Sequence, residues 1–446
     1  MSLPRYGEYK DSGVEWLGEV PAHWEVKRLR TVAELNPSKS EIADITRSTD
    51  VSFLPMEAIG DDGTLNLERI RPLAEVETGY TYFRDGDVTI AKITPCFENG
   101  KGALMSGLSS GIGFGTTELI VARPKTNHVT GEYLNWLFNS RQFRNHGEAS
   151  MYGAGGQKRV PDDFVRNFVS AFPPLPEQTS IATFLDRETG KIDALIGEQE
   201  KLLRLLAEKR QATISHAVTK GLNPDAPMKD SGVEWLGQVP AHWGLTRLKY
   251  AADLIVDCPH ETPIYDDDGD YKVVRTADVT EGKLDSSAMY SVTEAEYVNR
   301  IRRQALAKDD IVYGREGERW GFAALIPETD KYCLGQRMMQ FRTASATCPH
   351  YLMWQLNSVS TYRQGQLDTV GATSPHVNVG TIRNYVLAEP PLEEQRQISK
   401  FLTAETARLD ALTAEATRAI TLLKERRTAL ISAAVTGKID VRHEAA

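Results

Sequence analysis

One fifteen-residue block occurs twice in this chain. The block Lys10–Trp24, KDSGVEWLGEVPAHW, returns at Lys229–Trp243 as KDSGVEWLGQVPAHW, and the copies differ only where Glu19 is replaced by Gln238. A near-identity of this length within one chain indicates duplication. The repeat therefore has to be defined before any structural element is assigned.

The repeat continues through the rest of the chain. The further matched segments are Tyr133–Ser140 with Tyr351–Ser358, Arg166–Asn167 with Arg383–Asn384, Pro173–Gln178 with Pro390–Gln395, and Lys209–Thr219 with Arg426–Thr436. The poorest matches lie between Trp24 and Tyr133 and between Trp243 and Tyr351. Two copies that share a frame but differ inside it predict two binding modules with different targets.

The modules themselves have an α+β pattern. Short runs rich in β-forming residues alternate with glycine-rich connections, and apolar residues at helical spacing follow them. The predicted strands cover 50–56, 87–93 and 117–122 in the first copy and 272–275, 310–313 and 340–342 in the second, with helices at 132–144 and 350–357.

A long helix is predicted to follow the double proline of each copy. Its apolar residues fall on a four-three spacing, which is typical of a coiled-coil seam. These residues are Ile181, Leu185, Ile192, Leu195, Leu202 and Leu206 in the first copy, and Ile398, Leu402, Leu409, Leu412, Leu423 and Leu430 in the second. We predict that the helices pair antiparallel; the alternative is that each covers its own domain. Gly190 and Gly197 predict a bend or greater mobility in the first helix alone.

These patterns predict four segments in cyclic order. They are a first recognition module at 1–175 containing block 10–24, a central helix at 176–222, a second module at 223–391 containing block 229–243, and a C-terminal helix at 392–446. Because the order is cyclic, we expect the two ends of the chain to lie near each other.

Composition is that of a cytoplasmic protein rather than a membrane or secreted one. No apolar run reaches the roughly 20 residues of a membrane span, and the N-terminus has no apolar signal segment. The cysteines Cys96, Cys258, Cys333 and Cys348 form no CxxC pair, which favours reduced thiols over a metal site. The net charge of −9 disfavours nucleic acid unless basic clusters or a basic partner supply the phosphate contacts.

No motif for catalysis was found in the sequence. It contains no Asn-Pro-Pro-Tyr/Phe methyltransferase motif, phosphate loop, HExxH or G-x-S-x-G. The glycine run Gly111–Gly115 lacks the strand, helix and acidic residue of a dinucleotide site. Histidines His23 and His242 stand beside tryptophans in the repeated block, where a structural role is the simpler expectation.

The repeated blocks resemble the specificity subunits of type I restriction–modification systems. The resemblance covers essentially the whole chain and is based on GVEWLGxVPxHW, on PPLxEQxxIxxFL at Pro173–Leu185 and Pro390–Leu402, and on the helix endings ISHAVT and ISAAVT. It implies two tandem pseudo-symmetric target recognition domains, each of which reads half of a bipartite DNA sequence, joined by a long antiparallel two-helix coiled coil.

The resemblance also implies partners. They are double-stranded DNA, two copies of an S-adenosylmethionine-dependent adenine methyltransferase subunit, and an ATP- and Mg²⁺-dependent translocase and nuclease subunit. No cofactor, metal or catalytic residue is expected in this chain itself.

Two loop regions in each module are the candidate DNA contacts. The first pair is 92–101 and 313–320, where Arg315 and Arg319 could read guanine, Asn99 adenine, and Glu98, Glu316 or Glu318 cytosine. The second pair is 153–159 and 371–378, whose glycines let backbone amides approach phosphates. The candidate residues are Lys92, Thr94, Glu98, Asn99, Lys101, Gln157, Lys158, Arg159, Tyr313, Arg315, Glu316, Arg319, Gln336, Arg337, Thr373, Ser374, His376 and Asn378.

Simpler interpretations of these features stay open at this stage. Each loop could be a solvated hairpin or a structural turn, and the whole chain could be a coiled-coil adaptor whose acidic modules bind proteins. An enzyme would need a catalytic constellation that the sequence does not contain.

Overall fold

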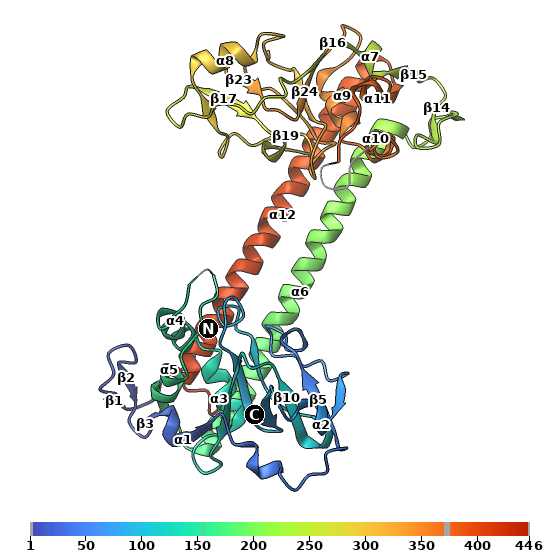
Figure 1. Ribbon diagram of the computed structural model, residues 1–446. Helices are drawn as coiled ribbons and strands as arrows, with labels where there is room; N and C mark the ends of the chain where they lie inside the picture. Colours follow the sequence, from blue (N-terminus) through green and yellow to red (C-terminus); the bar gives the residue numbers. More distant parts are fainter. Residues whose placement is uncertain (1–2, 155, 370–374, 445–446) are drawn as a thin grey trace. The chain divides into compact units, whose positions relative to one another are not determined.

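The computed structural model describes residues 3–154, 156–369 and 375–444, which form two compact units (Figure 1). Unit 1 contains the chain up to Glu200 and again from Arg418 onwards, and unit 2 contains Lys201–Thr417. The units divide both long helices, so they group the four predicted segments differently. No helix among the described residues is both long and apolar enough to cross a membrane.

Unit 1 is built on two four-stranded sheets. One has the order β4–β11–β8–β9 (Ala33–Leu35, Leu119–Pro124, Val88–Ala91, Gly102–Leu104), and the other β6–β5–β10–β7 (Ile70–Pro72, Asp50–Leu54, Ile112–Gly115, Thr81–Arg84). Two further pairs join β1 to β2 (Tyr9–Asp11, Glu19–Pro21) and β3 to β12 (Glu25–Arg28, Val169–Phe172). Its short helices are α1 to α5 (Leu29–Val32, Leu73–Val76, Gly131–Phe138, Arg141–Ala149, Asp162–Asn167).

Unit 2 repeats this plan with fewer strands in its second sheet. The first sheet has the order β16–β24–β21–β22 (Ala252–Asp257, Met338–Thr343, Ile311–Gly314, Ala323–Leu325), and the second β20–β17–β23 (Ser291–Val292, Tyr271–Val274, Tyr332–Leu334). The remaining pairs are β13 with β14 (Met228–Asp230, Gln238–Pro240), β15 with β25 (Gly244–Arg247, Val386–Glu389) and β18 with β19 (Val279–Thr280, Lys283–Leu284). Its short helices are α7 to α11 (Leu248–Ala251, Glu294–Arg300, Pro349–Leu356, Val359–Gln366, Val379–Arg383).

All six predicted strands are present, but one predicted helix is wrong. The stretch 132–144 forms α3 and α4, because Ser140 begins a new helix: its hydroxyl accepts from the Phe143 amide at 3.4 Å. Ser358 caps α10 in the same way through Thr361.

The two long helices, α6 (Leu175–Lys220) and α12 (Leu392–Val435), run antiparallel and pack together within each unit. In unit 1, Ile181 near the start of α6 shares a core with Ile431 near the end of α12. In unit 2, Val218 near the end of α6 shares a core with Ile398 near the start of α12. The fold is thus α+β, with pseudo-symmetric modules on an antiparallel helix pair.

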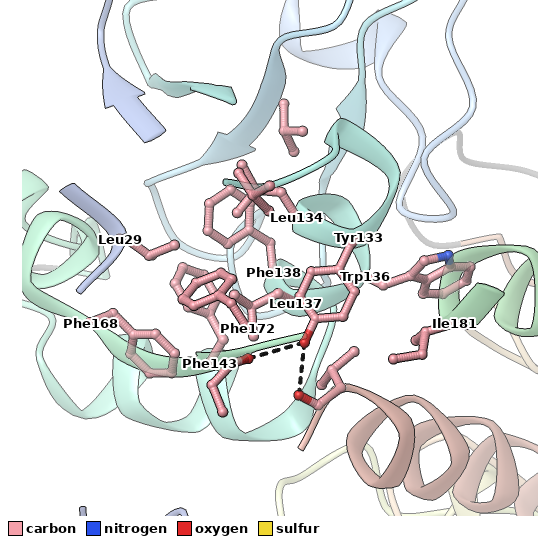
Figure 2. Close-up of a cluster of buried hydrophobic side chains, with 14 of the residues drawn as sticks. Leu29, Tyr133, Leu134, Trp136, Leu137, Phe138, Phe143, Phe168, Phe172 and Ile181 are labelled. Carbon is pink, nitrogen blue, oxygen red and sulfur yellow. Dashed lines mark hydrogen bonds between the residues drawn. The ribbon is translucent and has the colours of Figure 1, made fainter. Parts of the chain in front are cut away.

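A tyrosine from each module binds the end of the helix that began with the other module. In unit 1 the Tyr133 hydroxyl donates toward the carbonyls of Val435 at 3.1 Å and Ala171 at 3.2 Å (Figure 2). In unit 2 the Tyr351 hydroxyl lies 3.2 Å from the Val218 carbonyl. Nearby, the Asp440 amide donates to the Pro4 carbonyl at 2.8 Å, which confirms that the chain ends lie close together.

The repeated block packs on the start of the long helix of its own copy. The indole Nε1 of Trp24 donates to the Glu177 carboxylate at 3.0 Å, and His23 Nε2 lies 2.7 Å from the other oxygen. In the second copy Trp243 Nε1 and His242 Nε2 both contact one oxygen of Glu394, Oε2, at 3.0 and 2.8 Å. Both histidines therefore serve the structural role expected from the sequence.

The predicted seam is buried only in part. Ile181, Leu185, Ile192 and Leu206 are buried on α6, and Ile398, Leu402 and Leu409 on α12. The predicted seam residues Leu195, Leu202 and Leu412 are not buried, with exposed fractions of 46%, 40% and 38%. Heptad spacing places residues on one helix face, but only a neighbouring side chain removes that face from water.

Candidate nucleic-acid interface

In unit 1 the two predicted loops lie side by side at the ends of β8 and β11. The Thr94 amide donates to the Lys158 carbonyl at 3.0 Å, and the Val160 amide to the Lys92 carbonyl at 2.8 Å. A third segment, unexpected from the sequence, joins them, because the Lys92 amide donates to the Glu118 carbonyl at 2.8 Å. Segments separated by more than 60 residues thus form one surface.

Unit 2 brings its loops together with the same backbone pattern. The Val377 amide donates to the Arg315 carbonyl at 3.1 Å, and the Gly317 amide to the Pro375 carbonyl at 2.9 Å. The Arg315 amide donates to the Arg337 carbonyl at 3.1 Å. This pattern makes Lys92 equivalent to Arg315, Glu118 to Arg337, Lys158 to Pro375, and Arg159 to His376.

Arg159 in unit 1 is held by a carboxylate. Its Nε lies 2.9 Å from Glu118 Oε2 and its Nη2 lies 2.7 Å from Glu118 Oε1, so one edge of the guanidinium is fully engaged. The hydrogen bonds and the positive charge of Arg159 hold the pKa of Glu118 below its usual range. The pair orients Arg159 while leaving its Nη1 without a hydrogen bond among the described residues.

A second arginine, Arg144, holds the first loop through hydrogen bonds to its backbone carbonyls. Arg144 of α4 donates to the Phe97 carbonyl at 2.9 Å and to the Gly100 carbonyl at 3.0 Å, and its guanidinium lies 4.8 Å from the Phe97 ring centre. Gly147 permits this packing, since an added Cβ would lie 2.2 Å from that ring. Arg144 therefore fixes the loop that carries Glu98 and Asn99.

The other predicted residues of unit 1 differ in what they can offer a ligand. Glu98, Asn99, Gln157 and Lys158 are exposed. The Lys101 Nζ donates to the Met56 carbonyl at 3.2 Å, and the Thr94 hydroxyl to the Lys158 carbonyl at 3.2 Å. Lys92 is half-buried. The exposed four have side chains available to a ligand, whereas Thr94 and Lys101 hold the loop.

Two predicted residues of unit 2 lie inside the module instead of on its surface. Tyr313 is fully buried, with its hydroxyl 3.3 Å from that of Tyr385. Arg315 is 7% exposed, and its guanidinium binds Asp257 at 3.1 Å, Glu316 at 2.6 Å and the Val377 carbonyl at 3.3 Å. Tyr313 belongs to β21, all four residues of which are buried, and the contacts of Arg315 join the segments around it.

The other predicted residues of unit 2 that the structure describes are at least partly exposed. Arg337, Arg319 and Asn378 are exposed, and Gln336 and His376 are half-buried. Arg319 donates to the Ala277 carbonyl at 3.2 Å, and Asn378 to Asp368 at 3.1 Å. Thr373 and Ser374 lie outside the described residues.

Gln336 and Arg337 border a hollow of about 290 Å³ that sequence reasoning missed. The rest of its wall is formed by Thr262, Tyr265, Arg275, Thr276 and Ala277. Arg275 is fixed by Asp278 at 2.7 and 3.0 Å and lies 3.8 Å from the Tyr290 ring centre. Only contacts between distant segments create this wall, so no local pattern predicted it. For Glu118, the available signal was its position at the start of the predicted strand 117–122.

Asp257, Cys258 and His260 form a group whose ligand atoms lie within 4.8 Å of one another. Such atoms could hold a metal ion, but Asp257 already accepts from His260 at 2.9 Å and from Arg315 at 3.1 Å. Burial raises the pKa of the Cys258 thiol to about 11, which disfavours the thiolate that a metal needs. We therefore assign this group to the support of Arg315.

Known proteins with sequences similar to this chain include specificity subunits of type I restriction enzymes. Residues 259–422 match the family described as type I restriction modification DNA specificity domain. The chain is 44% identical over 194 residues to the type I restriction enzyme EcoAI specificity subunit of Escherichia coli and 41% identical to the EcoEI specificity subunit. Each match covers 43% of this chain and 32% of the relative, so the chain spans about a third of the length of these relatives.

Other similarities extend over nearly the whole chain. A putative type I restriction enzyme MjaX specificity subunit of Methanocaldococcus jannaschii is 21% identical over 433 residues, 96% of either protein. A chain from a solved structure on complex assembly of the type I R-M system has a TM-score of 0.68 at 19% identity, covering 93% of this chain and 98% of that one. The HsdS subunit from Thermoanaerobacter tengcongensis has a TM-score of 0.57 at 18% identity, covering 97% and 99%.

Proposed function

We propose that this chain, a member of the family of type I restriction–modification specificity subunits, selects the DNA sequence on which a restriction–modification complex acts. Each module reads one half of a bipartite, asymmetric target. The observation that carries this proposal is the paired-loop surface, which occurs at equivalent places in both units although the two loop sequences differ. A shared frame with different side chains is what two readers of different half-sites need.

The chain contributes recognition and not chemistry in this proposal. Its paired loops present amides, guanidiniums and carboxylates, which suit base edges and phosphates. Adenine methylation, ATP-driven translocation and cleavage belong to partner subunits, which supply S-adenosylmethionine, ATP and Mg²⁺. Two copies of the methyltransferase subunit bind the helix pair, one for each repeat.

The acidic composition fits a subunit that binds DNA together with a partner. With a net charge of −9, the chain alone gains little from phosphate contacts, so a basic methyltransferase subunit supplies most of the non-specific affinity. The rival function, a protein-binding adaptor, predicts no change of DNA methylation when the gene is removed.

Modified-base sequencing of host DNA, with and without the gene, tests the proposal. We expect one asymmetric, two-part, adenine-methylated sequence to disappear on deletion and to return on complementation. Unchanged methylation in cells that express the methyltransferase partner would favour the adaptor, and co-purification would then identify its partners.

A further inference from the structure

Each unit has an arginine on the surface formed by the paired loops and the third segment, but Arg159 of unit 1 comes from the second loop and Arg337 of unit 2 from the third segment. In unit 1 the guanidinium of Arg159 is bound to Glu118 at 2.7 Å. The equivalent of Glu118 in unit 2 is Arg337, and the equivalent of Arg159 is His376. The guanidinium is thus carried by the second loop in unit 1 and by the neighbouring third segment in unit 2.

The surroundings of Arg337 place its charge beside the first loop of unit 2. An added Cβ at Gly317 would lie 3.3 Å from Arg337 Nη1, so this guanidinium lies against the loop residue equivalent to Thr94. Among the described residues, the Arg337 guanidinium has no hydrogen bond or ion pair. It is exposed and borders the hollow near Gln336.

The chemistry of the Arg159 pair favours a base over a phosphate. Glu118 engages the Nε–Nη2 edge and leaves the Nη1–Nη2 end of the fork, which is the geometry that binds guanine O6 and N7. The Glu118 carboxylate also neutralises the positive charge of Arg159, which weakens the attraction of this arginine for a phosphate. A fixed fork loses less conformational entropy on binding than a free arginine does.

We propose that each module reads one guanine with this guanidinium: Arg159, positioned by Glu118, in unit 1, and Arg337 in unit 2. The inference rests on the proposed function and adds which base is read and by which side chain. It replaces Arg315, which is buried, as the guanine reader of unit 2. Glu118 acts by positioning Arg159 and does not itself read a base.

Methylation by the complete complex measures this directly. The chain is expressed with its methyltransferase partner, and modified-base sequencing reports the target. Arg159→Ala should relax one G·C position in one half-site, and Arg337→Ala one G·C position in the other half-site, with discrimination falling roughly tenfold to hundredfold at that position alone. Arg71→Ala and Arg302→Ala, which alter exposed arginines away from the paired loops, should leave the target unchanged.

A rescue variant separates recognition from folding damage. Arg159→His should lose the guanine preference in the half-site read by unit 1. Adding Glu118→Arg recreates the unit 2 arrangement and should restore that preference. Glu118→Gln should keep the same guanine but lower the methylated fraction, because the fork is no longer held.

The outcomes distinguish the inference from the function on which it rests. An even loss of methylation over all positions in either arginine variant would mean a phosphate contact and overturn the inference. So would a relaxed position that is not G·C, or a double variant that stays as relaxed as Arg159→His. If the natural chain itself directs no methylation, the proposed function fails instead.

Discussion

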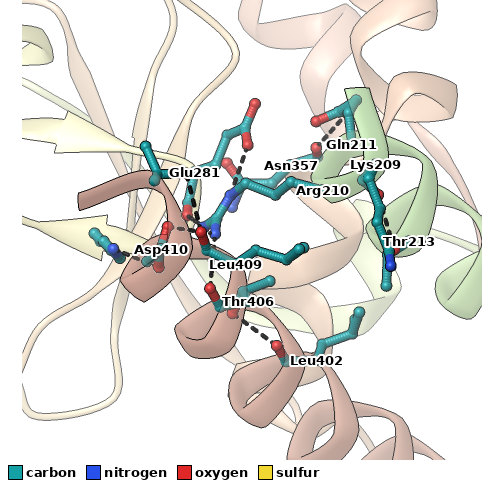
Figure 3. A network of polar contacts seen from close by, with 12 residues as sticks. Lys209, Arg210, Gln211, Thr213, Glu281, Asn357, Leu402, Thr406, Leu409 and Asp410 are labelled. Carbon is teal, nitrogen blue, oxygen red and sulfur yellow. Dashed lines mark hydrogen bonds and ion pairs between the residues drawn. The ribbon is translucent and has the colours of Figure 1, made fainter. Parts of the chain in front are cut away.

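Two equivalent arginines on the long helices differ in how deeply they are buried. Arg210 of α6 binds Asp410 of α12 at 2.9 Å and Glu281 at 3.0 Å, and its side chain is 12% exposed (Figure 3). Arg427 of α12 binds Asp193 of α6 at 2.9 Å and is 28% exposed. In unit 2 the ion pairs of this arginine therefore include a residue of the module, Glu281. In unit 1 the equivalent ion pair joins only the two helices.

This difference predicts unequal costs for the same substitution. Arg210→Ala leaves two carboxylates half-buried without their arginine and should lower the free energy of unfolding of unit 2 by about 2–3 kcal/mol. Arg427→Ala should cost less than about 1 kcal/mol in unit 1 because its pair is closer to water. Urea unfolding followed by tryptophan fluorescence measures both, and equal losses would contradict the assignment.

Cysteine reactivity offers a second test at the scale of residues. Burial raises the pKa of Cys258 to about 11 and of Cys333 to about 12, so at pH 8 their thiolate fractions are about a thousandth or less. Cys96 and Cys348 are half-buried. We expect a thiol reagent to label Cys96 and Cys348 in the native protein and all four after denaturation. Rapid native labelling of Cys333 would mean that its core opens.

Individual site residues were the least predictable feature of the sequence. Glycine and strand endings identified the paired loops, but Arg315 looked like a free loop arginine until Asp257, which lies 58 residues earlier, was placed beside it. Glu118 was not predicted for the same reason, since its role depends on Arg159. Local patterns locate segments, whereas burial and ion pairs depend on contacts between them.

At the scale of elements, the long helix α6 is destabilised by two glycines that can be replaced. Added Cβ atoms at Gly190 and Gly197 meet nothing within 4 Å, and glycine costs about 1 kcal/mol relative to alanine inside a helix. Gly190→Ala with Gly197→Ala should therefore raise stability by about 1–2 kcal/mol and slow amide exchange around both sites. Gly147→Ala is the opposing control and should destabilise, because its Cβ would overlap the Phe97 ring. Equal exchange protection of α6 and α12 in the natural chain would show no weakness.

The pH dependence of the paired loops follows from Glu118. Its pKa is lowered in the folded protein by Arg159, so the pair stabilises the fold above the unfolded pKa near 4.5 and loses this contribution as the pH falls through the folded pKa. Glu118→Gln should thus be less stable than the natural chain at pH 7 and approach it in acid. A constant difference across pH 3–7, measured by thermal unfolding, would contradict the ion pair.

For the whole molecule, the repeat alone predicted the cyclic arrangement. Tandem order predicted that the first block lies near the end of the second helix, and Lys438, just after α12, donates from its Nζ to the carbonyls of Leu17 and Glu19 in that block. The exposed leucines of the helix pair were beyond prediction, because heptad spacing carries no information on which turns of two helices actually touch.

A circular permutant tests this arrangement. Joining the natural ends by a short flexible linker and opening the chain between Pro224 and Asp225, in an exposed connection, breaks no strand or helix. We expect a melting temperature within a few degrees of the natural chain and the same methylated sequence. Opening the chain between Leu202 and Leu203 interrupts α6 and should prevent folding. If both permutants were equally stable, an unbroken α6 would not be required for the fold.

The tyrosine contacts with the opposite helix ends also set an order of events at the ribosome. All of unit 2 is contained in residues 201–417, so its parts are available before synthesis ends. The first module, although translated first, lacks Val435 and the rest of the closing turns of α12 until the last residues emerge. Unit 1 therefore cannot complete its fold until the C-terminus has been synthesised. A premature stop near the end of α12 would leave unit 1 unfinished, although it is translated first, and would spare unit 2.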